Sequence, residues 1–225
     1  MTSTALRTKT FKDLEALGFH PAKSLPQPNV KAKLRSTTEI AARLMGLDAL
    51  FAWVAIPEKS LTTKRIQKHI ERNALRDWLT FEEAEIIDLP RRKAHKTHVD
   101  IIGWKLENMW ALAWVLGFNP EPGLDASQIS NDVARQLLFE FLPGFDSGID
   151  DIVAKAVPRS KSEVVAMEYR FYCAHNAVRS AQLGGKTVPP GFHPFLHGGA
   201  IHERRHALSW CLDPDVGWDD TDLST

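Results

Sequence analysis

The clearest pattern of chemically active residues lies near the end of the 225-residue sequence, where His202-Glu-Arg-Arg-His206 matches H-E-x-x-H. On a helix these two histidines, four positions apart, share one face, so they can hold Zn²⁺ while Glu203 acts as the general base of a hydrolase. His193 and His197 lie just upstream and are candidates for a third ligand. A zinc-dependent hydrolase is therefore one prediction from the sequence.

Other features of the same segment argue against a metal. Arg204 and Arg205 would bring positive charge next to a dication. Ser209 and Leu212 stand where an extended zinc-protease pattern requires Gly and His. A short pattern also arises readily by chance in a chain with nine histidines. We therefore expect no cofactor and keep zinc at the two histidines of the motif as the alternative.

Charge is distributed unevenly along the chain, although the formal net charge is zero. Residues 1–98 hold 18 basic and 11 acidic residues, an excess of seven basic residues. Residues 99–225 show the opposite, with seven more acidic than basic residues. The densest basic run, Pro90–His98, has no interleaved aromatic residues and no nucleic-acid-binding motif around it. We expect a solvated loop and helix start there, and nucleic-acid binding through the basic N-terminal half is a second alternative.

Signals for helices cover most of the sequence. Capping-box patterns, in which a Ser or Thr precedes a Glu by three positions, start at Ser36, Thr80 and Ser160. Apolar residues then recur at helical spacing between Pro and Gly breaks, and Ser60 is the expected cap of a further helix. The predicted helices lie near residues 36–56, 60–75, 80–89, 97–116, 131–141, 150–156, 160–183 and 199–212.

No segment shows the period-two alternation of a strand, so we expect an all-α protein. The predicted architecture is a single globular domain of about eight helices over residues 31–225, with residues 1–30 as a loosely attached N-terminal arm. Cys173 and Cys211 are too few for a disulfide framework, which favours a reducing compartment. No apolar run approaches the roughly 20 residues of a membrane span, and the N-terminus lacks the apolar core of a signal peptide. We expect a cytoplasmic protein that makes no membrane contact.

Four short segments, in order, resemble a bacterial family, the domain-of-unknown-function family numbered 4272. The segments are Arg35-Ser36 with Glu39 and Arg43, Trp104-Lys-Leu-Glu107 with Ala111 to Gly117, Tyr169-Arg170 with Ala174, and Glu203 to Trp210 followed by Trp218-Asp-Asp220 and Asp222. The resemblance covers residues 35–222 and implies an all-helical domain of unknown activity. It also implies that the characteristic pair is Glu203-Arg204, which makes the flanking histidines look accidental.

The segments that carry the resemblance place charged residues among aromatic ones. Because charges near a core must be paired, we expect one buried or half-buried ion-pair network that either fixes helix packing or lines a pocket for a small polar ligand. The candidate members are Trp104, Glu107, Arg170, Glu203, Arg204, Asp219 and Asp220.

The motifs of nucleotide-binding loops and of serine hydrolases are missing from the sequence. The leading interpretation is therefore a non-enzymatic cytoplasmic helical domain that binds a protein partner or a small polar ligand. The zinc-dependent hydrolase and the nucleic-acid binder remain its alternatives.

Overall fold

Polar side chains at the starts of helices determine where several of those helices begin. In the computed structural model, which describes residues 2–125 and 128–225, Ser36, Thr80 and Ser160 each cap a helix. Each accepts a hydrogen bond from the backbone N–H of a Glu three residues later, and that Glu bonds back to the cap. These three predicted capping boxes are confirmed. The prediction of Ser60 as a cap is wrong, because the hydroxyl of Thr62 accepts the capping bond from Arg65 N instead.

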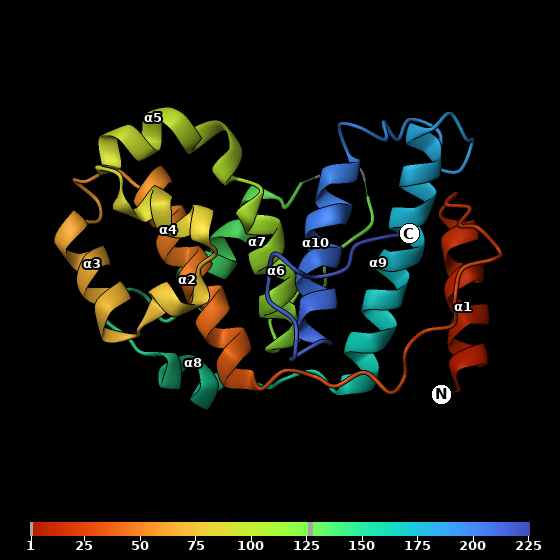
Figure 1. Cartoon of the computed structure of the whole chain (residues 1–225), viewed down its shortest axis with the longest axis horizontal. Coiled ribbons are helices and arrows are strands. Elements are labelled where there is room, and N and C mark those ends of the chain that lie inside the picture. Colours follow the sequence, from red (N-terminus) through yellow and green to blue (C-terminus); the bar gives the residue numbers. More distant parts are fainter. Residues whose placement is uncertain (1, 126–127) are drawn as a thin grey trace. The chain divides into compact units, whose positions relative to one another are not determined.

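The described residues form ten α-helices and no strand, so the all-α prediction is confirmed (Figure 1). They are α1 (Ser3–Ala16), α2 (Thr37–Ala55), α3 (Thr63–Arg72), α4 (Phe81–Asp88), α5 (Arg91–Ile102), α6 (Lys105–Val115), α7 (Asn131–Gln136), α8 (Ile149–Lys155), α9 (Lys161–Gln182) and α10 (Gly198–Cys211). Two shorter segments, η1 (Leu75–Trp78) and η2 (Leu137–Phe141), have 3₁₀ and π geometry.

The expected number of about eight helices is too low for two reasons. The single helix expected over residues 97–116 is divided, because Gly103 and Trp104 separate α5 from α6. Glycine is among the weakest helix formers, so a break there is physically reasonable. The second addition is α1, which lies in the segment that we expected to be an arm.

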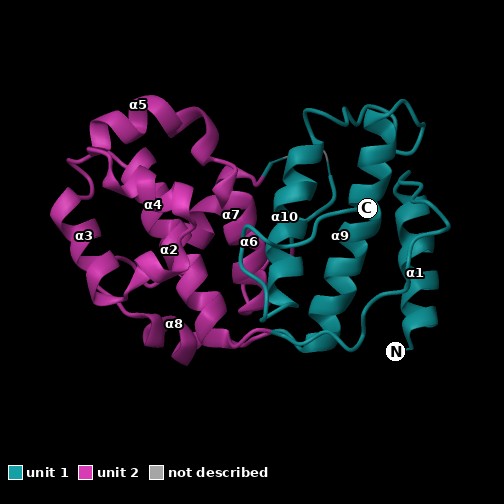
Figure 2. Cartoon of the chain, viewed as in Figure 1, with its two compact units in different colours: residues 1–34, 122–128, 159–225 teal, residues 35–121, 129–158 magenta. Residues whose placement is uncertain are grey.

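The chain divides into two compact units (Figure 2). Unit 1 comprises Met1–Leu34, Pro122–Gln128 and Arg159–Thr225, and it contains α1, α9 and α10. Unit 2 comprises Arg35–Glu121 and Ile129–Pro158. In unit 2 the helices α3, α5, α6 and α8 all pack on α2, which is buried along most of its length.

The first 30 residues contrast with the expected loose arm. Helix α1 packs against α9 within unit 1, and Leu6, Leu14 and the following Phe19 are buried. Arg7 Nη1 also donates to the Tyr169 hydroxyl on α9 at 2.9 Å. This segment therefore supplies part of the core of unit 1.

A buried ion-pair network joins α2 to α4 in unit 2. Arg43, only 1% exposed, donates to both carboxylate oxygens of Glu83 at 2.6 and 3.0 Å. Lys105 Nζ donates to the same carboxylate at 2.6 Å. Burial alone would raise the pKa of Glu83, but the two cations outweigh it and lower that pKa to about 2. Glu83 therefore stays ionised at neutral pH.

The C-terminal end of α2 is completed by a side chain from α5. Arg91 donates to the carbonyl oxygens of Ala52, Trp53 and Ile56 at that end, and Nη1 also donates to Leu61 O at 2.6 Å. Its Nη1 lies 2.8 Å from a Glu58 carboxylate oxygen as well. The basic run that we expected to be a solvated loop and helix start is thus mostly the helix α5, and its first arginine is engaged with backbone.

Candidate ligand site between α9 and α10

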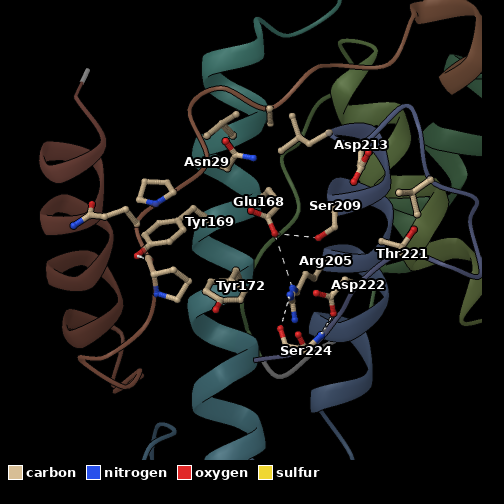
Figure 3. A pocket seen from close by; sticks show the side chains of 17 residues that line it. Asn29, Glu168, Tyr169, Tyr172, Arg205, Ser209, Asp213, Thr221, Asp222 and Ser224 are labelled. Carbon is tan, nitrogen blue, oxygen red and sulfur yellow. Dashed lines mark hydrogen bonds and ion pairs between the residues drawn. The ribbon is translucent and has the colours of Figure 1, made fainter.

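A pocket of about 450 Å³ opens in unit 1 between α9 and α10. Figure 3 shows Glu168, Tyr169 and Tyr172 projecting from α9, with Arg205 and Ser209 opposite them on α10. The segments 26–32 and 212–224 complete the lining. The pocket therefore joins residues that are far apart in the sequence, and all of them belong to unit 1.

Helical spacing and one glycine position the two walls. Positions 165, 168, 169 and 172 follow one face of α9, and positions 205 and 209 follow one face of α10. Gly198, in the first turn of α10, lies so close to α9 that a Cβ there would meet Val178 Cγ1 at 2.6 Å. A side chain at this position would require either Val178 or the start of α10 to shift.

Arg205 is the central residue of the pocket. Its side chain is buried, with 3% exposed. Nη1 donates to Leu223 O at 2.8 Å, and Nη2 donates to Ser224 O at 3.1 Å. The guanidinium also lies over the ring of Tyr172, 4.8 Å from its centroid. Nε is buried and has no hydrogen-bond partner in the part of the chain that the structure describes.

His175 fixes the orientation of that guanidinium from α9. Arg205 Nη1 lies 2.7 Å from His175 Nδ1, and since a guanidinium only donates, Nδ1 accepts. The imidazole proton therefore sits on Nε2, which lies 3.4 Å from His202 Nδ1. Burial and the neighbouring Arg205 lower the pKa of His175 to about 3, so the ring is neutral in the physiological range.

Glu168 faces Arg205 without a close ion pair. Its Oε1 accepts a hydrogen bond from Ser209 Oγ at 3.0 Å and lies 3.9 Å from Arg205 Nε. Burial raises the pKa of Glu168, and Arg205 and Ser209 offset this only in part. The pocket thus holds an opposite pair of charged groups whose separation exceeds a hydrogen bond.

The rim of the pocket is acidic. The charged side chains that line it are Glu168, Arg205, Asp213 and Asp222, and the last two are exposed. Asp222 Oδ1 accepts from Ser224 N at 2.9 Å, and this bond lowers the pKa of Asp222. Three carboxyl groups therefore accompany a single guanidinium.

The two histidines of the H-E-x-x-H pattern lie on α10 with different partners. His202 lies against His175, as described above, whereas His206 Nε2 donates to Trp218 O at 2.9 Å and its ring lies 4.3 Å from that of Trp218. Among the described residues, no group of three or more His, Cys, Asp or Glu side chains is arranged to hold a metal. Zinc binding at His202 and His206 stays a prediction.

The seven residues expected to form one ion-pair network are spread over both units. Trp104 and Glu107 belong to unit 2, where the Glu107 carboxylate accepts from Ile129 N at 2.7 Å. Arg204, in unit 1, is fully buried; it donates to Gly123 O at 2.7 Å and lies 3.9 Å from an Asp125 oxygen.

The remaining four members all lie in unit 1. Arg170 and Glu203 are half-buried on α9 and α10, and Asp219 and Asp220 are exposed near the end of the chain. Their joint network stays a prediction, and none of the four lines the α9–α10 pocket.

The sequence interpretation missed the residues that do line it. Arg205 was treated only as an argument against zinc, and Glu168 and Tyr172, which line the pocket, and His175, which holds Arg205, were not singled out. A signal was present, since Glu168, Tyr172 and His175 follow one another at helical spacing along α9. The backbone carbonyl groups of Leu223 and Ser224, which accept from Arg205, could not be predicted from the sequence, because every residue has a backbone carbonyl group.

Among the described helices, none is both long and apolar enough to cross a membrane. Residues 6–221 match a family model described as Domain of unknown function (DUF4272). This match begins at residue 6, in α1, whereas the four segments that resemble the family begin at residue 35. No curated protein and no solved structure matches the chain.

Proposed function

The chain belongs to the family described as Domain of unknown function (DUF4272), and we propose from its own side chains that unit 1 is a binding domain for a small polar ligand held in the pocket between α9 and α10. Arg205 is the observation that carries this proposal, because its buried Nε–H has no hydrogen-bond partner in the described chain. Leaving a buried donor unpaired costs about 1–3 kcal/mol. A ligand acceptor at Nε would recover that free energy.

The size and construction of the pocket support the same function. Its volume of about 450 Å³ falls in the range of roughly 300–1,000 Å³ that is usual for small-molecule sites. The polar groups stand on two helices, and His175 and two backbone carbonyls hold Arg205 in place before any ligand arrives. Such preorganisation reduces the entropy lost on binding.

We favour binding over catalysis because of the partners of Ser209. A serine nucleophile needs a base that is itself oriented by a third group. Here the Ser209 hydroxyl bonds to Glu168, while His175, on α9, uses Nδ1 for Arg205. The described side chains of the pocket therefore support recognition of a ligand rather than activation of a nucleophile.

A thermal-shift screen with amino acids, nucleosides, sugar phosphates, dicarboxylates and amines tests this function. We expect at least one compound to raise the Tm of the wild type by roughly 5–10 °C when present at a hundred times its Kd. The compound should not shift the Tm of Arg205→Lys, because lysine lacks the planar guanidinium and its fixed N–H donors. It should still shift the Tm of Arg65→Lys, a control at an arginine whose side chain is 49% exposed.

Two results would contradict the proposed function. One is a screen in which no compound shifts the Tm or changes the NMR spectrum of the wild type. The other is a ligand that stabilises Arg205→Lys as strongly as the wild type, because that ligand would bind elsewhere.

A further inference from the structure

We infer that the ligand of this pocket is a free α-amino acid with an uncharged side chain, a conclusion that rests on the proposed function. The inference concerns the class of ligand and comes from three properties of the pocket. These are the edge that Arg205 presents, the position of Glu168 beside it, and the charge and apolarity of the remaining lining.

The first property is the edge of the guanidinium that stays available. His175 and Leu223 O occupy Nη1, and Ser224 O is the one acceptor of Nη2 within the described residues. What remains is Nε–H together with the second N–H of Nη2. In a guanidinium these two bonds are parallel, and their spacing matches the two oxygens of a carboxylate. Arg205 is therefore oriented to bind a carboxylate side-on.

The second property is the acceptor next to that edge. Glu168 Oε1 lies 3.9 Å from Arg205 Nε, and no described residue other than Ser209 donates to this carboxyl group. In an α-amino acid a single carbon separates the ammonium from the carboxylate, so its opposite charges also lie side by side. The ammonium then faces Glu168 while the carboxylate faces Arg205. The hydroxyl of Tyr172, on the next turn of α9, is a further acceptor for the ammonium.

The third property is the balance of charge. An anion without an ammonium would meet Glu168, Asp213 and Asp222 and be repelled. A cation without a carboxylate would pair with these three carboxyl groups, but it would leave the Nε–H of Arg205 without an acceptor. A zwitterion is the simplest class that pairs with both signs of charge at once.

The rest of the lining sets the kind of side chain. Val165, Leu212 and Val216 line the pocket, together with Pro26 and Pro28 of the segment before α2. These groups offer apolar contact and no charge. An uncharged amino-acid side chain therefore fits them better than a charged one.

Calorimetric titration of the full chain with neutral L-amino acids tests the inference. The tightest binder is then compared with its methyl ester, which lacks the carboxylate charge, and with its N-acetyl derivative, which lacks the ammonium. We expect each derivative to bind at least tenfold more weakly than the parent. Glu168→Gln should weaken binding of the parent, whereas Glu140→Gln, at an exposed glutamate, should leave it unchanged.

The outcomes separate the ligand class from the proposed function. If an ester or N-acetyl derivative binds as tightly as the parent, or if only simple amines or inorganic phosphate bind, the amino-acid class is wrong and a binding pocket remains. If none of these probes binds and the wider thermal-shift screen is also negative, both proposals are wrong. The methyl ester and the N-acetyl derivative are titrated into the wild-type chain, so misfolding of a variant cannot explain any loss of their affinity.

Discussion

The two units each contain a buried arginine and a glutamate, yet the two pairs differ in nearly every physical property. In unit 2, Arg43 and Glu83 make two hydrogen bonds of 2.6 and 3.0 Å, and the pKa of Glu83 falls to about 2. In unit 1, Arg205 and Glu168 lie 3.9 Å apart, and the pKa of Glu168 is raised. Burial raises the pKa of both carboxyls, so the difference comes from the cations: Arg43 and Lys105 both lie within hydrogen-bond distance of Glu83, whereas Arg205 alone faces Glu168 from 3.9 Å.

The contrast separates a structural ion pair from a binding site. A buried carboxylate that accepts two charge-assisted bonds offsets its desolvation and holds two helices together. A half-buried carboxyl such as that of Glu168, which lies beyond hydrogen-bond distance of its arginine, leaves hydrogen-bonding capacity on both groups. That capacity is available to a ligand, so the less complete pair is the better candidate for function.

The largest expected effect is on stability in unit 2. Glu83→Gln leaves Arg43 as a buried cation without its carboxylate, so we expect the free energy of unfolding to fall by about 3 kcal/mol. Urea denaturation at pH 7 measures the change. Glu82→Gln, at the exposed neighbouring glutamate, is the control and should change the value by less than about 0.5 kcal/mol. Equal effects of the two variants would show that the buried pair contributes no special stability.

The same pair predicts a dependence of stability on pH. Because the pKa of Glu83 is about 2 in the folded chain and 4.5 ordinarily, its ionised form stabilises the fold above about pH 4.5. This contribution should disappear as the pH falls from about 4.5 towards 2. Urea denaturation of the wild type and of Glu83→Gln across that range should give curves that converge. Curves that stay parallel would place the folded pKa of Glu83 near its ordinary value.

A smaller effect, of opposite sign, is expected for Glu168. Its pKa is raised in the folded chain, so losing the proton costs more free energy in the folded than in the unfolded state. Stability therefore falls as the pH rises above the ordinary pKa of 4.5. Glu168→Gln should therefore leave the unfolding free energy at pH 7 unchanged or raise it by up to about 1 kcal/mol. A loss of more than about 2 kcal/mol in urea denaturation would make this pair structural, like that of unit 2.

The smallest expected effect is the coupling between Glu168 and the hydroxyl that bonds to it. Ser209→Ala removes a single hydrogen bond of 3.0 Å, so we expect a loss of about 1 kcal/mol in the unfolding free energy. In Glu168→Gln, whose amide oxygen can still accept from this hydroxyl, the same change should cost about as much. A double-mutant cycle by urea denaturation measures the coupling, and a strong coupling would show that Ser209 acts through the charge of Glu168.

Local signals in the sequence were sufficient for most of the helices. Ser36, Thr80 and Ser160 each marked a helix start, because a capping box involves residues only three positions apart. The break between α5 and α6 was missed, since the apolar pattern runs on across Gly103. A residue in the capping box of α4, Glu83, also pairs with Arg43, 40 positions earlier, and no local pattern carries that contact.

The candidate site was harder to predict for the same reason. Arg205 could be read only as a charge inside a motif, because its partners are a histidine 30 positions earlier and two carbonyls near residue 224. The choice of Glu203, Arg204 and Arg170 came from a resemblance, and such a resemblance identifies a family without showing which face of a helix looks into a pocket.

The way in which α2 ends has a consequence for the order of folding. Its last carbonyl groups bond to Arg91, which lies about 35–40 positions further along the chain, and no glycine completes the helix locally. The last turn of α2 can therefore become complete only after α5 has docked. In native-state hydrogen exchange, the amides of that turn should open together with α5, as one cooperative element, while the first turn, closed by its own capping box, can form independently.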